Sequence, residues 1–154
     1  MTLAIKAIKL NNYRSYEHLC LSALGQLTIL AGPNAVGKTN IIEAIRLLTG
    51  ISPIRHATTA EYIREGTARA DVSLLAEGDK RSLELGLTIT PGAKSYSLNK
   101  KHKSSTEMRG IIPSVAFTPD DLTLVKGTGK PKRKALDSLG FQVNSAYAEV
   151  YKDF

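Results

Sequence analysis

The sequence is poor in the residues that build disulfides and metal clusters. Its 154 residues include a single cysteine, Cys20. One thiol cannot close an intrachain disulfide, and it gives no indication of a cysteine-based metal cluster. A lone cysteine most often behaves as a small apolar side chain, so we expect Cys20 to be a buried or idle thiol.

Long apolar runs are also missing. No run approaches the roughly 20 residues that cross a bilayer. The opening "MTLAIKAIKLNNYRSY" carries lysines within an alternating pattern, and it lacks the apolar stretch and cleavage site of a signal peptide. The chain has no internal repeat, no low-complexity segment, no clear linker and no sustained heptads. These absences predict one cytoplasmic domain with no membrane partner.

Positive charge is plentiful and unevenly placed. The net charge is +7, with ten basic and eight acidic residues in 1–93 and eleven basic and six acidic residues in 94–154. Basic clusters of this kind suit a phosphate backbone, because each neutralised phosphate releases counterions. A solvated basic surface is the alternative. The predicted nucleic-acid contacts are Lys100, Lys101, Lys103, Lys130, Lys132, Arg133 and Lys134.

Apolar spacing predicts a mixed α/β architecture. Alternation over 3–10 indicates a strand, and 11–19 is expected to be a loop. The short apolar run at 26–32 predicts a buried strand. A helix is expected from Lys38 to Gly50, with Ile41, Ile42, Ile45 and Leu48 near its inner face.

The later part of the chain alternates more regularly. A short helix is expected within 59–65. Three strand-like segments separated by turn residues predict an antiparallel meander, at 69–77, 81–90 and 94–100. A further apolar strand is predicted at 111–119 and a helical turn at 120–125. Pro131 suits the first turn of a last helix that runs to the C-terminus.

One motif carries specific chemistry. "GPNAVGKT" fits the phosphate-binding pattern G-x-x-x-x-G-K-[ST], between a predicted strand and a predicted helix. Glycines let backbone amides approach phosphates closely, and the helix N-terminus adds partial positive charge. Lysine would reach the β- and γ-phosphates, and threonine would bind Mg²⁺. The predicted nucleotide-phosphate contacts are Gly32, Pro33, Asn34, Ala35, Val36, Gly37, Lys38 and Thr39, with Thr39 also the Mg²⁺ ligand.

The surroundings of this motif resemble one family. "IKLNNYRSYEHLCL" followed by "LTILAGPNAVGKTNIIEAIRLLTG" is similar to the N-terminus of RecF, a family of SMC-like DNA repair ATPases in the ABC superfamily. "GISPIRHATTAEYIREG" and "FTPDDLTLVKGTGKPKRKALD" resemble later RecF segments in the same order. The resemblance implies an α/β P-loop NTPase fold. Residues 1–154 would form one partial ABC/SMC-type head domain, the N-terminal half, containing the antiparallel β meander.

The resemblance also implies a function and partners. These are ATP and Mg²⁺ as cofactors, single-stranded or gapped DNA, homodimerisation, and recombination mediator proteins. The implied setting is DNA replication, recombinational repair and the SOS response. Two alternatives stay open: a non-catalytic nucleotide- or DNA-binding module, and the head fragment of another SMC-like ATPase.

Individual residues follow from the resemblance too. Arg14 matches an arginine that SMC-like ATPases place near the nucleotide, where its fork would grip phosphate oxygens. Asn40 continues the phosphate-binding motif, with helix capping as its alternative, and Glu43 is expected to give surface support to the helix. Arg55 and His56 lie where a loop would approach nucleotide or DNA, although a structural role is favoured.

Some family features are missing. Ala35 replaces a frequent glycine, and no glutamine follows the strand at 111–119, which leaves Asp120 or Asp121 as guesses for a second Mg²⁺ ligand. No convincing aspartate–glutamate strand or signature loop follows the motif; "LLAEGD" and "LSALGQ" are weak imitations. The sequence therefore leaves open whether this chain alone hydrolyses ATP.

Overall fold

The fold is described from a computed structural model. It describes residues 3–51, 57–79, 81–118, 129–144 and 147. The chain forms two compact units, residues 1–108 and 109–154. Each unit is described by itself below.

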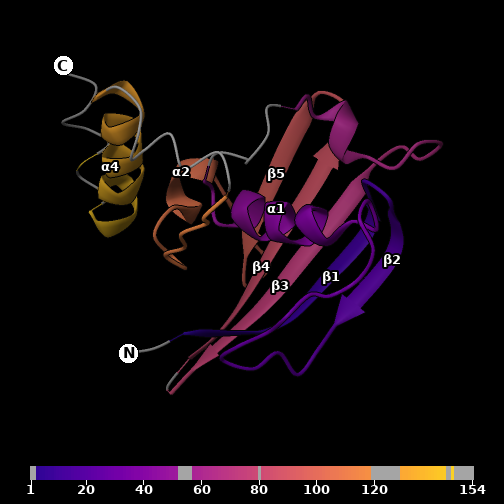
Figure 1. The fold of residues 1–154 in the computed structure, drawn as a ribbon, viewed down its shortest axis with the longest axis horizontal. Coiled ribbons are helices and arrows are strands. Elements are labelled where there is room, and N and C mark those ends of the chain that lie inside the picture. Colours follow the sequence, from indigo (N-terminus) through magenta and orange to yellow (C-terminus); the bar gives the residue numbers. More distant parts are fainter. Residues whose placement is uncertain (1–2, 52–56, 80, 119–128, 145–146, 148–154) are drawn as a thin grey trace. The chain divides into compact units, whose positions relative to one another are not determined.

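The first unit is built on one antiparallel sheet (Figure 1). Its six strands lie in the order β2-β1-β3-β4-β5-β6. Every neighbouring pair is antiparallel, and the β1–β3 pairing shifts register between Ile5 and Ala7. The strands are β1 (Ala4–Tyr13), β2 (Tyr16–Leu21), β3 (Ala70–Gly78), β4 (Arg81–Thr90), β5 (Ala93–Leu98) and β6 (Lys101–Lys103).

Helix α1 (Lys38–Leu48) packs on β3 and β4 and covers one face of this sheet (Figure 1). Residues on a strand alternate between faces, so every second side chain of β3 and β4 points toward the helix. The core formed in this way contains Ile8, Leu10, Val72, Leu74, Leu85, Leu87 and Ile89 from the sheet and Ile41, Ala44, Leu47 and Leu48 from α1.

The described residues contain three further helices, two in the first unit and one in the second. A 3₁₀ helix, η1 (Ala60–Tyr62), buries Tyr62, and α2 (Ser105–Met108) buries Met108. In the second unit, α4 (Gly129–Val143) is the long helix. The amide of Ser114 donates to the side-chain oxygen of Gln142 on α4, at 2.7 Å.

Much of the predicted architecture is confirmed. Strand 3–10 is the first part of β1, helix 38–50 is α1, and a short helix lies within 59–65. The meander at 69–77, 81–90 and 94–100 corresponds to β3, β4 and β5. Pro131 lies in the first turn of α4, but the helix ends at Val143 and not at the C-terminus.

Two predicted buried strands are wrong. Residues 26–32 form no strand, and the side chains of Leu27 and Ile29 are 81% and 79% exposed. Residues 111–118, the described part of the second segment, also form no strand, and Val115 and Phe117 are exposed. A strand needs a neighbour to pair its backbone groups. Neither segment has such a neighbour among the described strands.

One smaller expectation is also wrong. The predicted loop at 11–19 is mostly strand, because β1 continues to Tyr13 and β2 pairs with it through a tight hairpin. Cys20 was expected to be a buried or idle thiol; it is exposed on β2, which excludes the first alternative and leaves the second as a prediction. The expected helical turn at 120–125, together with Arg55, His56, Asp120 and Asp121, lies outside the described residues.

Candidate nucleotide-phosphate site

The predicted phosphate loop runs over the surface into the N-terminus of α1. Gly37 is the N-cap of this helix, with φ of 102°, a backbone conformation that favours glycine. No side chain caps the helix by a hydrogen bond, and its first turn holds no acidic residue. The free amides and the helix dipole are therefore available to an anion.

Lys38 closes over the loop from its C-terminal end. Its ammonium group donates to the carbonyl oxygens of Gly32, at 2.7 Å, and Pro33, at 2.5 Å. Both acceptors are exposed backbone atoms of the same loop. A lysine held in this position lies at the mouth of the loop, where a phosphate would meet its charge.

Ala35 departs from the usual glycine at its position. Its φ is 65°, the left-handed region that costs most residues about 1–2 kcal/mol. The loop therefore keeps the backbone conformation that a glycine would allow, at a small energetic cost.

Thr39 and Asn40 follow in the first turn of α1. Thr39 is exposed beside the loop. The Asn40 amide donates to the Gly37 carbonyl oxygen at 2.8 Å, and its side-chain nitrogen donates to the Ser15 hydroxyl at 3.2 Å. Asn40 thus ties the helix start to the β1–β2 turn.

The β1–β2 hairpin contacts the loop through Ser15 of its two-residue turn and Tyr16, the first residue of β2. The Tyr16 hydroxyl donates to the Val36 carbonyl oxygen at 3.3 Å. A Cβ atom on Gly37 would lie 2.8 Å from the Tyr16 hydroxyl oxygen and 2.9 Å from that of Ser15. The absence of a side chain at Gly37 therefore lets the turn and the loop meet.

Arg14, in the same turn, forms an ion pair with Glu43 of α1. Its Nη2 donates to Oε2 of Glu43 at 2.8 Å. Glu43 is 1% exposed, so the expectation that it gives surface support is wrong. The structure thus places Arg14 beside α1; its proposed contact with nucleotide stays a prediction.

Two tyrosines surround this ion pair. Tyr13 and Tyr62 stack with ring centroids 6.1 Å apart, and the Arg14 guanidinium lies 4.6 Å from the Tyr62 centroid. Lys94 of β5 lies 4.7 Å from the same centroid. Burial raises the pKa of both tyrosines, and the Glu43 carboxylate raises it further. Burial lowers the pKa of Lys94, although Glu43 opposes this shift.

The predicted DNA contacts are divided between the two units, and each group is described by itself. Lys100 and Lys101 are exposed in the first unit, whereas the Lys103 ammonium is paired with Glu107 at 2.7 Å. Lys132 and Arg133 are exposed on α4 in the second unit. The side chains of Lys130 and Lys134 lie outside the described residues.

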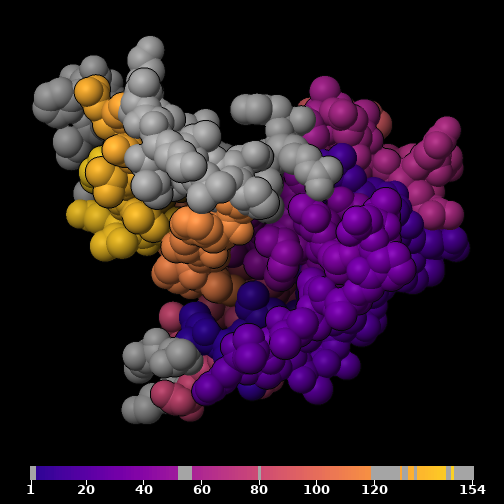
Figure 2. Space-filling model, in the orientation of Figure 1, coloured from indigo at the N-terminus to yellow at the C-terminus, as the bar shows by residue number. Residues whose placement is uncertain are grey.

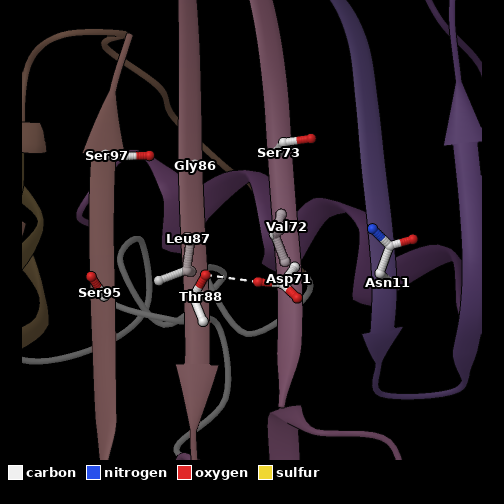
Figure 3. Close-up of a pocket in the computed structure, with 9 residues that line it drawn as sticks. All are labelled: Asn11, Asp71, Val72, Ser73, Gly86, Leu87, Thr88, Ser95 and Ser97. Carbon is white, nitrogen blue, oxygen red and sulfur yellow. Dashed lines mark hydrogen bonds between the residues drawn. The ribbon is translucent and has the colours of Figure 1, made fainter. Parts of the chain in front are cut away.

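A shallow pocket of about 300 Å³ lies on the other side of the sheet. Figure 3 shows its polar side chains in front of the strands, with the α1 ribbon passing behind them. The Thr88 hydroxyl donates to Asp71 there at 2.7 Å. This pocket is therefore separate from the phosphate loop.

Ser15, Tyr16 and Glu43 are the site residues that the sequence reasoning missed. Polar and aromatic side chains in a turn give no periodic signal. A glutamate within a helix gives none either, since its burial depends on what packs against it. The one available signal is the polar and aromatic segment "YRSY", residues 13–16, which precedes the phosphate loop in the chain.

The described part of the chain contains no helix long and apolar enough to cross a membrane. It also contains no group of three or more histidine, cysteine, aspartate or glutamate side chains that would hold a metal ion.

Comparison with known proteins identifies the family. Residues 3–110 match the AAA ATPase domain family. The chain is similar to the structure of the recombination mediator protein RecF-ATPrS in the RecFOR pathway, with 26% identity and a TM-score of 0.86 over 94% of this chain and 40% of that one. The RecF-ATP structure matches with 27% identity and a TM-score of 0.77, over 88% and 38%.

An SMC head domain from Thermotoga maritima matches at 23% identity with a TM-score of 0.54, over 68% of this chain and 40% of that one, which indicates a shared fold. The chain spans about two fifths of the length of the RecF structures, a share that fits their N-terminal portion. It therefore belongs to the AAA ATPase domain family and has the P-loop fold of the RecF and SMC head structures.

Proposed function

We propose that the loop at 32–39 binds the phosphates of ATP, and that the chain is the nucleotide-binding part of a RecF-like, DNA-binding repair protein. The observation that carries this proposal is the N-terminus of α1. Gly37 is its N-cap residue, no side chain caps it by a hydrogen bond, and Lys38 is the first residue of the helix. A helix N-terminus of this form is suited to an anion. The RecF structures that the chain resembles are named for ATP or an ATP analogue.

Mg²⁺ fits the same place. This ion keeps several of its waters and takes one or two protein oxygens together with substrate phosphates. Thr39 offers one hydroxyl oxygen in the first turn of α1, beside the loop. Thr39 would therefore hold the ion, which when bound neutralises charge on the phosphates.

Calorimetry with ATP and Mg²⁺ tests the proposal. The intact chain should bind ATP, and Lys38→Ala should weaken binding at least about tenfold, since a hydrogen bond to a charged group contributes about 1.5–3 kcal/mol. Lys9→Ala is the matched control, because Lys9 is an exposed lysine on β1 that lies outside the phosphate loop. Equal affinity of the wild type and Lys38→Ala would refute the proposal.

DNA is the second proposed ligand. The net charge of +7 and the exposed side chains of Lys100, Lys101, Lys132 and Arg133 support contact with backbone phosphates without sequence preference. Lys103 contributes less, because its charge is already paired with Glu107.

Fluorescence anisotropy with gapped and single-stranded DNA over a salt series tests this contact. If Lys100 and Lys101 each contact a phosphate, replacing both by alanine should reduce the slope of log affinity against log salt by about 1.8 for duplex regions. Lys9→Ala should leave the slope unchanged. An unchanged slope in the double variant would place the DNA contact elsewhere.

Binding without turnover is the state we propose for this chain by itself. Glu43 is the buried carboxylate of α1, and it is held by Arg14 and so is not free to act as a base. One SMC structure that the chain resembles is described by ATP-driven dimerisation and DNA-stimulated activation. Dimerisation of this kind and a role in recombinational repair are proposed here by similarity. Phosphate release measured in the calorimetry samples tests turnover, and release that depends on Lys38 would contradict this state.

A further inference from the structure

Glu43 is a charged side chain in a place where apolar side chains are the rule. It lies on the buried face of α1 with Ala44 and Leu47, at 1% exposure. We propose that Glu43 is a positioning residue, which acts through Arg14 to hold the β1–β2 turn against the phosphate loop. This inference rests on the proposed nucleotide binding, and it adds a residue that touches neither the loop nor its ligand.

The first step of the argument is the tight hold on Arg14. Besides the 2.8 Å ion pair with Glu43, its backbone amide donates to the Tyr62 carbonyl oxygen at 2.9 Å, and its guanidinium lies over the Tyr62 ring. The Arg14 φ of 52° shows a turn held in the left-handed region. A conformation of this kind persists only when its surroundings determine it.

The second step is the contact of the next two residues with the loop. Ser15 accepts a hydrogen bond from Asn40, and Tyr16 donates to the Val36 carbonyl oxygen. Both hydroxyl oxygens lie so close to Gly37 that a methyl group there would clash with them. The side of the loop that carries the helix N-cap therefore rests on the β1–β2 turn.

The two steps form one contiguous path. Glu43 fixes Arg14, Arg14 fixes the turn, and the turn supports Val36 and Gly37. The path begins and ends on α1 or the residues just before it, so the helix positions its own phosphate loop through the hairpin. Buried ion pairs add little net stability by themselves, and their best-supported role is to specify one arrangement.

The buried ion pair between Glu43 and Arg14 carries an energetic penalty, because part of each polar group is left unpaired. Oε1 of Glu43 and Nε of Arg14 are buried with no hydrogen-bond partner in the described part of the chain. An apolar pair would avoid that penalty. The arrangement therefore favours a role in geometry over a role in stability.

Glu43→Gln tests the inference by the sign of its effect on ATP affinity. Glutamine keeps the size of the side chain and removes the charge that holds Arg14. If Glu43 positions the loop, ATP binding should weaken on the order of 3- to 30-fold, the range of coupling seen for residues without ligand contact. If Glu43 only competes with phosphate for Arg14, its removal should leave binding unchanged or make it tighter, and that result would overturn the inference.

Three further variants separate positioning from general destabilisation. Arg14→Lys should weaken binding too, and the double variant should bind no more weakly than the weaker single one, since both act along one path. Ile8→Val is the matched control, because it trims a fully buried side chain of β1, six residues before Arg14. A loss of affinity in Ile8→Val equal to that of Glu43→Gln would also overturn the inference.

Hydrogen exchange without nucleotide supplies a second readout. In Glu43→Gln the amides of 15–16 and 34–40 should exchange faster, while those of β4 should not change. Unchanged exchange in 34–40 would refute the positioning role whether or not the chain binds ATP. The two proposals therefore fail separately: equal ATP affinity of the wild type and Lys38→Ala refutes the nucleotide site, and the Glu43→Gln results refute only the positioning role.

Discussion

Two leucines of the first unit offer a test of where its core ends. Leu27 lies in a segment whose apolar pattern predicts a buried strand, yet its side chain is 81% exposed. Leu85 is fully buried in β4. The same change, leucine to alanine, should therefore have very different effects on the free energy of unfolding.

The magnitudes follow from burial. Complete burial of a leucine contributes about 1.5–3 kcal/mol, and about a fifth of the Leu27 side chain is buried, so Leu27→Ala should cost about 0.3–0.6 kcal/mol. Leu85→Ala removes buried atoms and leaves a cavity, with an expected cost of about 2–5 kcal/mol.

Urea unfolding followed by far-ultraviolet circular dichroism measures both costs, with equal slopes as the check that the same transition is compared. Both residues belong to the compact unit of residues 1–108, so we expect one unfolding transition to report on both. A cost above about 2 kcal/mol for Leu27→Ala would show that residues 26–32 pack as the strand that their sequence suggests, and it would refute the exposed arrangement.

Three further predictions concern the loop, its support and pH. Arg14→Ala leaves the carboxylate of Glu43 buried without its cation, so the free energy of unfolding in urea should fall by about 3–5 kcal/mol. Gly37→Ala should abolish ATP binding in calorimetry, because the new methyl group meets two hydroxyl oxygens and φ is 102°. The Lys103 ammonium and the Ser104 amide and hydroxyl lower the pKa of Glu107 to about 2; NMR titration should show this value, and Lys103→Met should raise it.

The pH prediction has a definite sign. The pKa of Glu107 in the folded chain lies below its ordinary value of 4.5. Its ionised form is therefore favoured by folding, and the support that it gives α2 is complete above about pH 4.5 and is lost as the pH falls toward 2. A Glu107 titration midpoint near 4.5 would contradict the observed hydrogen bonds.

Controls separate these effects from general damage. Gly92→Ala is the partner of the Gly37 variant, because no atom lies within 4 Å of a Cβ added at Gly92. It should bind ATP as the wild type does. Equal binding by the Gly37 variant, or a cost below 1 kcal/mol for Arg14→Ala, would show that the turn and the loop are not packed as described.

The sequence predicted the meander well because each strand carries its own signal. In β3 and β4 the buried side chains alternate strictly, and turn residues separate the strands. A strand with one face on a core must show this alternation. The helix and the phosphate motif were also predictable, since both depend on residues close together in the chain.

The errors share one physical cause, which is dependence on a partner. An apolar run such as 26–32 shows that a segment can be buried, but not that a neighbouring strand exists to pair with it. This segment lies at the surface between β2 and α1, in purple in Figure 2. In α1, likewise, Ile42 is 40% exposed while Glu43 is buried, because contact with the sheet and Arg14 decides which face turns inward.

Gly37, the second glycine of the phosphate motif, meets both a local requirement of the backbone and a requirement of packing against a distant segment. Its place in the motif follows from the local backbone, which at Gly37 has a φ that few other residues adopt. The structure adds a second demand, because Ser15 and Tyr16 approach its Cα from a turn about twenty residues earlier in the chain. A residue that tolerates the backbone conformation, such as asparagine, would still clash with the turn. Glycine at this position is therefore required by packing against the β1–β2 hairpin as well as by phosphate binding. A loop transplanted into another protein without that hairpin should lose its conformation.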